Sequence, residues 1–298
     1  MSPAPDLRPE PLAGPPAGRA PPAWGASAAT AERPSPAAGD GPRSRPIGNP
    51  APPRFRPLIL PVGDTALTVD FGDAIDPLRN RAVLALEQSL AAAELPGILE
   101  TVPSYRALMI VYDPAEIGFG PLAEQVRARL DRLEGRALAP RRRWVVPVAY
   151  DPPFGLDLDE LSQALGLPAE AILSRHATPA YSVYMVGFAP GFTYLGGLDP
   201  ALAVPRRASP RPIVPAGSVM IGGQQAAIVS VPIPTGWYVI GRTPMRAFDP
   251  DRADPFMFRP GDRVRFRPVR PAEFARLAAL PADELRILAR EDAACQDF

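Results

Sequence analysis

The sequence predicts an α+β fold, and three observations predict it. With a strand at 143–150 counted, the apolar runs after residue 55 follow the order β-α-β-β-α-β of a split-βαβ sandwich. Between Tyr181 and Pro250, short apolar runs alternate with Gly and Pro, which is typical of strands in a compact β structure. Residues 1–54 are dominated by Pro, Ala and Gly. We therefore expect an extension over 1–54, an α+β domain over 55–140 and a β domain over 141–298.

The extension has almost no aliphatic side chains to bury, so its composition favours a disordered segment. It also lacks the apolar stretch of a secretory signal. A Pro-rich docking arm for a partner is the alternative interpretation.

The first elements of the α+β domain have clear local signals. Alternating apolar residues predict a strand over Thr65–Phe71. Asp76 before Pro77 is a helix N-cap with Pro in the first turn, and the helix should run to about Ala93. Pro96-Gly97 then stops it.

The rest of this domain continues the alternation. Two strands are expected at Ile98–Val102 and Ala107–Tyr112, joined at Pro103-Ser104. Pro121 should open a second helix, and Arg143–Tyr150 returns to strand. Two short helices follow before the β domain, around Leu158–Leu165 and Pro168–Arg175, and the zero net charge argues against a DNA-binding helix-turn-helix.

Composition excludes several classes of function. Net charge is zero, and no run approaches the roughly 20 apolar residues of a membrane helix, so neither nucleic acid nor a membrane is expected as a partner. The chain has no Lys, so it cannot carry a biotinyl-lysine, form a lysyl Schiff base or supply a P-loop lysine. One Cys, Cys295, excludes an internal disulfide and a Cys-based metal site. A cytoplasmic location is the default.

His176 is the only histidine, at the end of the second short helix. A cation or hydrogen-bond donor is favourable there, so capping is one interpretation. A proton donor facing a ligand is the other. Without neighbouring His, Cys or acidic ligands in a metal-binding spacing, no metal site is expected.

The segment 181–250 holds few polar residues, and they gather at turns. Arg206, Arg207 and Arg211 lie within six positions, and Arg suits bidentate capture of a carboxylate or phosphate, although a solvated face is the simpler interpretation. Gly and Pro around Phe188 and Phe192 predict a tight turn whose two rings pack in the core. No nucleophile elbow, P-loop or dinucleotide-binding glycine motif is present.

Several of these stretches occur in one order that resembles a known family. They are PVGDTALTVDFGD, His176, YSVYMVGFAPGFTYLGGLDP, PRRASPRPIVPAGSV, the turn at Gln224 and GWYVIGRTP, within residues 57–270. The chain is similar to the family of 5-oxoprolinase B subunits, also described as kinase-A-inhibitor-like or allophanate hydrolase subunit 1. That resemblance implies a cyclophilin-like β barrel as the second domain. Two stretches depart from the family pattern: Ile233–Trp237 in place of Ser-Pro-Gly-Gly-Trp, and Val229-Ser230 in place of Tyr-Pro.

The resemblance implies a subunit of an ATP-dependent enzyme that opens 5-oxo-L-proline to L-glutamate. Its partners would be subunits C and A, and ATP would be used by the assembled complex. Breaking a lactam requires donors for the developing oxygen charge and an anchor for the substrate carboxylate. His176 is then the candidate proton donor. The expected substrate-binding residues are Tyr184, Arg211, Gln224, Trp237, Arg242 and Thr243.

Two alternatives stay open at this stage. One is carboxyl transfer from carboxybiotin to urea or a related amide. The other is a binding module that inhibits a sensor histidine kinase, which the absence of a nucleophile–base pair also fits.

Overall fold

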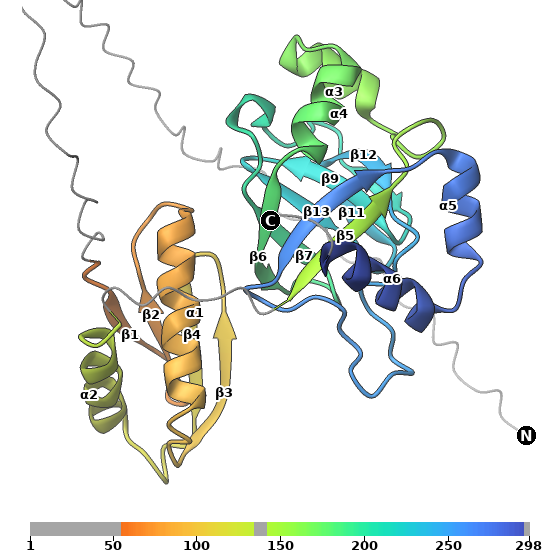
Figure 1. Cartoon of the computed structure of the whole chain (residues 1–298). Coiled ribbons are helices and arrows are strands. Elements are labelled where there is room, and N and C mark those ends of the chain that lie inside the picture. Colours follow the sequence, from red (N-terminus) through yellow and green to blue (C-terminus); the bar gives the residue numbers. More distant parts are fainter. Residues whose placement is uncertain (1–54, 134–141, 295–298) are drawn as a thin grey trace, which may run out of the picture. The chain divides into compact units, whose positions relative to one another are not determined.

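The computed structural model describes residues 55–133 and 142–294 (Figure 1). These residues form two main sheets, each with an apolar core of its own. The extension expected over 1–54 and the residue Cys295 lie outside the described residues. No helix in the described part of the chain is both long and apolar enough to cross a membrane.

The first sheet has four strands in the order β1-β2-β4-β3, and all neighbours are antiparallel. Two helices, α1 and α2, pack their apolar side chains onto it in one core with Leu67 and Ile110. The bounds are β1 Leu58–Val62, β2 Ala66–Asp70, α1 Pro77–Ala91, β3 Ile98–Pro103, β4 Ala107–Tyr112 and α2 Phe119–Leu130.

The start of α1 forms as the local sequence predicts. The Asp76 carboxylate accepts hydrogen bonds from the backbone N–H groups of Leu78 (2.8 Å) and Arg79 (3.1 Å), which have no partner inside the helix. In contrast, α2 begins at Phe119, two residues before Pro121. Proline is tolerated there because the N–H groups of the first helical turn have no partner within the helix.

The split-βαβ expectation for this part is not confirmed. The strand at 143–148 (β5) pairs in parallel with β13 of the second sheet and does not return to the first. The first sheet is completed instead by β1, which the sequence did not reveal. β1 is an edge strand with its apolar residues largely exposed, Leu58 at 61% for example, so it lacks the alternation that marks a half-buried strand.

The second sheet has seven strands in the order β12-β9-β10-β7-β6-β13-β5. It curls until its two edges meet, because Ala149 and Arg242 exchange backbone hydrogen bonds of 2.9 and 2.8 Å. Two further short strands, β8 and β11, pair with each other. The bounds are β5 Arg143–Val148, β6 Ala180–Val186, β7 Thr193–Gly196, β8 Arg211–Val214, β9 Ser218–Gly222, β10 Gln225–Ile228, β11 Ile233–Thr235, β12 Tyr238–Arg242 and β13 Arg263–Pro268.

Four helices complete the core of the curled sheet: α3 (Leu158–Leu165), α4 (Ala169–Ala177), α5 (Pro271–Ala278) and α6 (Ala282–Ala294). In Figure 1, α3 and α4 lie together at one end of this sheet, and α6 packs beside β5.

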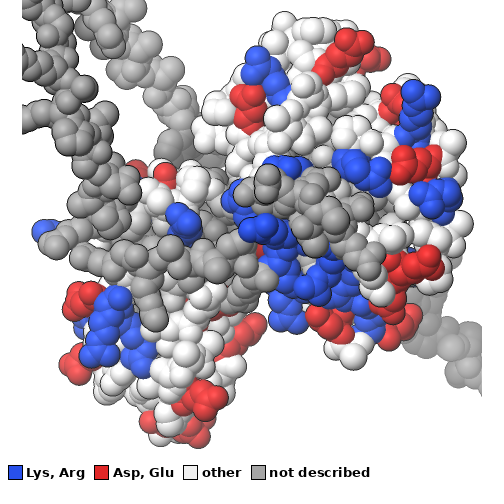
Figure 2. Space-filling model, in the orientation of Figure 1, with Lys and Arg blue, Asp and Glu red and all other residues white. Residues whose placement is uncertain are grey.

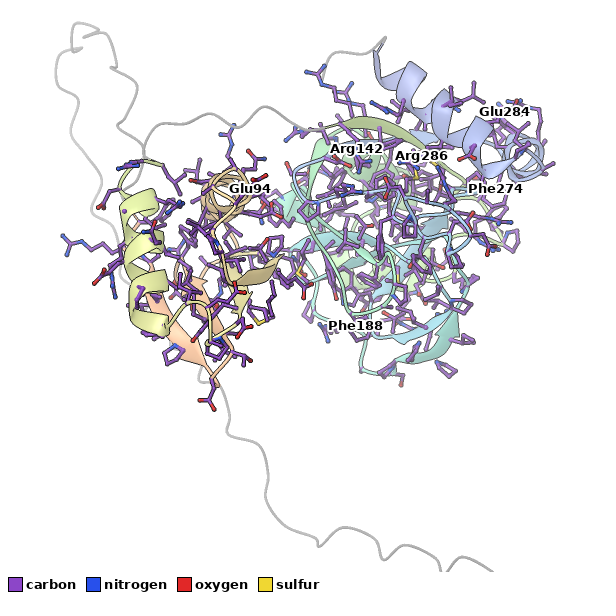
Figure 3. The ribbon with its side chains drawn as sticks, turned by 90° about the horizontal axis from the view of Figure 1, so that it is seen from below. Glu94, Arg142, Phe188, Phe274, Glu284 and Arg286 are labelled. Carbon is purple, nitrogen blue, oxygen red and sulfur yellow. The ribbon has the colours of Figure 1, made fainter. Side chains whose placement is uncertain are left out.

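An arginine-rich surface lies where α6 meets β5. The guanidinium groups of Arg142, Arg286 and Arg290 lie 5.2 to 5.7 Å from the Trp144 ring, within the range of cation–π attraction. Acidic partners accompany them, since buried Asp262 accepts hydrogen bonds from Arg142 and from the Trp144 indole. Figure 2 shows basic and acidic side chains side by side on this face, and Figure 3 places Arg142 and Arg286 together, away from Phe188.

Candidate functional site

Side chains of the curled sheet divide between two faces. One face receives buried residues from all seven strands, as the inside of a curled sheet should, and forms the large core with the helices. The opposite face of β7, β9, β10 and β12 carries Tyr194, Met220, Ala227 and Val239. With Phe192 and Trp237 these residues form a separate apolar cluster, which we call the aromatic face.

Two glycines let aromatic rings lie directly on this face. A Cβ on Gly222 would come within 2.6 Å of the Trp237 ring, and a Cβ on Gly196 within 2.0 Å of the Tyr184 ring. Only the absence of a side chain at each position permits these contacts. Burial raises the pKa of Tyr184 to about 12, so its hydroxyl stays protonated at neutral pH. Two of the predicted substrate-binding residues, Tyr184 and Trp237, therefore lie on the same side of the sheet.

Gln225 is the buried amide of the aromatic face. Its side chain has the parity of Ala227 in β10, is 7% exposed, and its Nε2 has no hydrogen-bond partner among the described residues. Leaving a buried donor unpaired costs about 1–3 kcal/mol, so such a group indicates a place for a ligand or water oxygen. The predicted Gln224 lies instead at the exposed tip of the β9–β10 turn.

Three tyrosine rings pack together, and one of them, Tyr105, lies beside the Gln225 amide. The Tyr105 ring packs edge-to-face on Tyr194 (5.5 Å between centroids) and on Tyr184 (6.4 Å). Burial raises the pKa of the Tyr105 hydroxyl well above its ordinary value, and the Gln225 amide beside it lowers that pKa in part. The Tyr105 hydroxyl, the Gln225 amide and two further rings thus form a polar spot in an aromatic surround.

The turn after β6 presents an exposed ring at the rim of this face. Phe188 is 77% exposed and has φ +73°, a region that a bulky side chain rarely adopts. Hydrogen bonds fix the turn, from the Gly187 N–H to the Phe192 carbonyl (3.1 Å) and from the Ser230 hydroxyl to the Pro190 carbonyl. As expected, Phe192 is buried, but Phe188 is not, and it packs edge-to-face on Phe192 at 5.8 Å.

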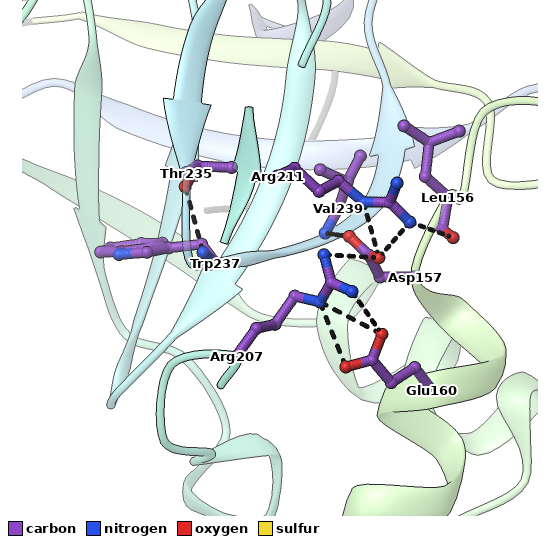
Figure 4. A network of polar contacts seen from close by, with 8 residues as sticks. All are labelled: Leu156, Asp157, Glu160, Arg207, Arg211, Thr235, Trp237 and Val239. Carbon is purple, nitrogen blue, oxygen red and sulfur yellow. Dashed lines mark hydrogen bonds and ion pairs between the residues drawn. The ribbon is translucent and has the colours of Figure 1, made fainter. Parts of the chain in front are cut away.

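Two arginines of the predicted cluster are engaged with acidic side chains of the segment that opens α3 (Figure 4). Arg211 donates to the buried Asp157 carboxylate at 2.8 and 2.6 Å. Arg207 forms a fork with Glu160, at distances down to 2.7 Å, and lies 3.4 Å from Asp157. Asp157 also accepts the Val239 N–H at 2.8 Å, so it joins this loop to β12.

Arg206 differs from its two neighbours. It is exposed, and no hydrogen bond or ion pair holds its guanidinium within the described residues. Its stem lies against Gly236, the residue before Trp237. Burial raises the pKa of both Tyr105 and Tyr194, and the positive charge of Arg206 opposes that rise in part. An uncompensated cation therefore lies beside the aromatic face.

The remaining predicted site residues lie at the ends of β12 and α4. Arg242 donates from Nε to the Ala216 carbonyl at 2.9 Å, and the hydroxyl of buried Thr243 accepts the Met245 N–H at 3.2 Å. These hydrogen bonds support the loop at 215–217 and the end of β12, so both polar groups serve local structure.

His176 lies in the core inside the curled sheet. It is 0% exposed, stacks on Phe266 at 4.6 Å between centroids, and its Nδ1 is 2.9 Å from the Tyr150 hydroxyl. Burial lowers its pKa to about 3, so it is neutral at pH 7. These contacts favour packing over a role as proton donor to a substrate on the opposite face. No group of three His, Cys, Asp or Glu in the described ranges could hold a metal ion.

Residues 57–258 match the family model of the carboxyltransferase domain, subdomain C and D. The chain belongs to this family. Within the carboxyltransferase-domain family, the 5-oxoprolinase B subunit of Bacillus subtilis (strain 168) is 36% identical over 218 residues, covering 70% of this chain and 91% of the relative. The protein of the same name from Escherichia coli O157:H7 is also 36% identical, over 210 residues, covering 70% and 94%.

Solved structures agree on the fold. A crystal structure of TTHA0988 is 39% identical with a TM-score of 0.61, and the match covers 69% of this chain and only 40% of that one. The Kluyveromyces lactis urea carboxylase is 19% identical with a TM-score of 0.63 over 75% of this chain and 23% of its own, which shows a shared fold alone. The mixed α/β architecture with its curled sheet is thus that of the carboxyltransferase-domain family.

Proposed function

We propose that this chain is the B subunit of an ATP-dependent 5-oxoprolinase complex, which hydrolyses 5-oxo-L-proline to L-glutamate. The observation that carries the proposal is its 36% identity to a 5-oxoprolinase B subunit over nine-tenths of that relative. The aromatic face supports it independently, because it presents the groups that a small cyclic amide acid requires.

5-Oxoproline has a flat ring, an amide oxygen and a carboxylate. Rings such as Trp237 and Tyr194 suit the flat ring, and the unpaired Nε2 of Gln225 is a donor for the amide oxygen. Water adds to the ring carbonyl carbon, the C–N bond breaks and the nitrogen takes a proton. Hydrogen bonds to the oxygen favour this step, since negative charge develops there.

Partner subunits supply what this chain lacks. Without Lys or a phosphate-binding glycine motif, the chain has no evident means of its own to bind ATP. We therefore assign ATP use to the assembled complex, with subunits C and A as partners. The curled sheet serves as a cyclophilin-like barrel in this proposal, with the α+β domain at 55–140 contributing Tyr105 to its outer face.

Reconstitution tests the proposal. The purified chain alone should neither hydrolyse ATP nor open 5-oxoproline, and both activities should appear when subunits C and A are added. Glutamate and ADP are measured together, and the matched control is the C and A pair without this chain. Turnover by the chain alone, or by C and A alone at the full rate, would contradict the proposal.

Carboxyl transfer is the second candidate. The matching family model favours it, because that family is described as a carboxyltransferase domain. A putative urea carboxylase of Emericella nidulans is 25% identical, although this chain spans only 21% of its length. Labelled bicarbonate distinguishes the two reactions, because transfer fixes the label in a carboxylated amide and hydrolysis does not.

A further inference from the structure

Three arginines, two in the loop before β8 and one at its start, have different surroundings. Arg207 and Arg211 direct their guanidinium donors to Asp157 and Glu160. Two acids thus neutralise two of the three cations and fasten the loop to α3 and β12. The third cation, Arg206, has no acidic partner in the part of the chain that the structure describes.

The held loop carries Arg206 to the aromatic face. The Arg207 N–H donates to the Gly236 carbonyl at 2.7 Å, which ties the loop to the turn before Trp237. A Cβ on Gly236 would lie 3.6 Å from the Arg206 Cβ and 3.9 Å from its Cδ, so the Arg206 stem lies along this turn. Gln225 lies opposite Gly222 in the β9–β10 pair, and the Trp237 ring lies over Gly222, so Gln225 and Arg206 both lie beside Trp237.

Resting on the proposed function, we infer that Arg206 binds the substrate carboxylate while Gln225 donates from Nε2 to the amide oxygen. The pair recognises the two polar ends of a cyclic amide acid, and the aromatic rings hold the flat ring between them. The two arginines expected to bind substrate, Arg211 and Arg242, do not serve as the anchor, since their side chains are already bonded to Asp157 and to the Ala216 carbonyl. The ligand class is a small lactam with a carboxylate beside the ring nitrogen.

Substitution of Arg206 tests the anchor in the reconstituted complex. Arg206→Gln should raise KM for 5-oxoproline roughly 10- to 150-fold, the equivalent of losing about 1.5–3 kcal/mol for a charged hydrogen bond. The value of kcat should change less than about threefold, because the amide contacts remain. The inhibition constant of 2-pyrrolidinone, which has the lactam but no carboxylate, should stay unchanged.

Two further variants separate the roles. Gln225→Leu should weaken the binding of both 5-oxoproline and 2-pyrrolidinone, because both ligands present the amide oxygen. Arg276→Gln is the matched control, an exposed arginine on α5 whose loss should change neither constant. Thermal unfolding of each variant verifies that the fold is intact.

The possible results distinguish a failure of the Arg206 anchor from a failure of the 5-oxoprolinase assignment. An unchanged KM in Arg206→Gln, or an equal loss of 2-pyrrolidinone binding, overturns the anchor while leaving the 5-oxoprolinase assignment standing. A wild-type complex that turns over no 5-oxoproline overturns the assignment. In that case, isothermal titration still tests the anchor, by comparing the affinity of the wild-type and Arg206→Gln complexes for 5-oxoproline. A wild-type complex that binds no 5-oxoproline overturns both the anchor and the 5-oxoprolinase assignment.

Discussion

Replacing Asp157 by Ala should destabilise the protein far more than replacing its neighbour Glu160. The Asp157 carboxylate is fully buried and accepts from Arg211 at 2.8 and 2.6 Å and from the Val239 N–H at 2.8 Å. Its removal leaves a backbone donor of β12 and two arginines without their shared partner.

The magnitude follows from burial. Removing one partner of a buried ion pair costs about 3–5 kcal/mol. Arg211 is one-third exposed, with a side-chain accessibility of 33%, so water compensates it in part and the lower end, about 3 kcal/mol, applies. For a protein of this size, about 2–4 °C in Tm accompanies each kcal/mol, which gives a fall of about 6–12 °C.

Circular dichroism during heating and urea titration of the purified chain measures the effect. Glu160→Gln is the matched control, because that carboxylate is 47% exposed and an exposed pair is worth about 0–1 kcal/mol. Asp157→Asn should fall between the two, since it keeps an acceptor for Val239 but loses the charge. Equal Tm values for Asp157→Ala and Glu160→Gln would refute the reasoning that Asp157 holds the loop.

Two further outcomes follow from burial and close approach. Because the pKa of His176 is about 3 when folded against an ordinary 6.5, the unfolded chain takes up the proton first as pH falls. The contribution of neutral His176 to the free energy of unfolding is complete above pH 6.5 and is lost toward pH 3, on the order of 2 kcal/mol between pH 7 and 5. His176→Gln should therefore reduce the fall of the urea midpoint over this pH range. The same pH profile in the variant and the original chain would show that His176 does not cause it. Gly222→Ala should displace the Trp237 ring, seen as altered tryptophan fluorescence and a lower Tm, whereas Gly120→Ala, with open space around it, should leave both nearly unchanged or raise Tm slightly; unaltered fluorescence in Gly222→Ala would contradict the ring contact.

Local signals in the sequence predicted local structure well. The N-cap at Asp76 and the stop at Pro96-Gly97 each depend on a few adjacent residues, and α1 lies where they place it. The strand at 143–148 was also found, but its partner was not. Pairing with β13, which is 120 residues later, depends on the whole chain, so the pattern could not exclude the split-βαβ arrangement.

Site residues were predicted less completely, for two physical reasons. The choice between Gln224 and Gln225 depends on one residue of register, since neighbours in a strand face opposite sides. The signal was present: Gly223-Gln224 is a two-residue hairpin loop with Gly223 at φ +60°, which leaves Gln225 as the first residue of β10. The pairing of Asp157 with Arg211 joins residues 54 apart and has no local signature.

The same long-range pairing explains why one arginine can serve a ligand while its neighbours cannot. A long flexible side chain loses conformational freedom when it binds, and a loop that is already fixed adds little to that loss. Asp157 fixes this loop through Arg211, and Glu160 fixes it through Arg207, so the backbone of Arg206 is held beside Trp237 before any ligand arrives. Arg207 and Arg211 therefore have a structural role. Because their side chains are fixed, exposed Arg206 has a defined position from which to bind an anionic ligand.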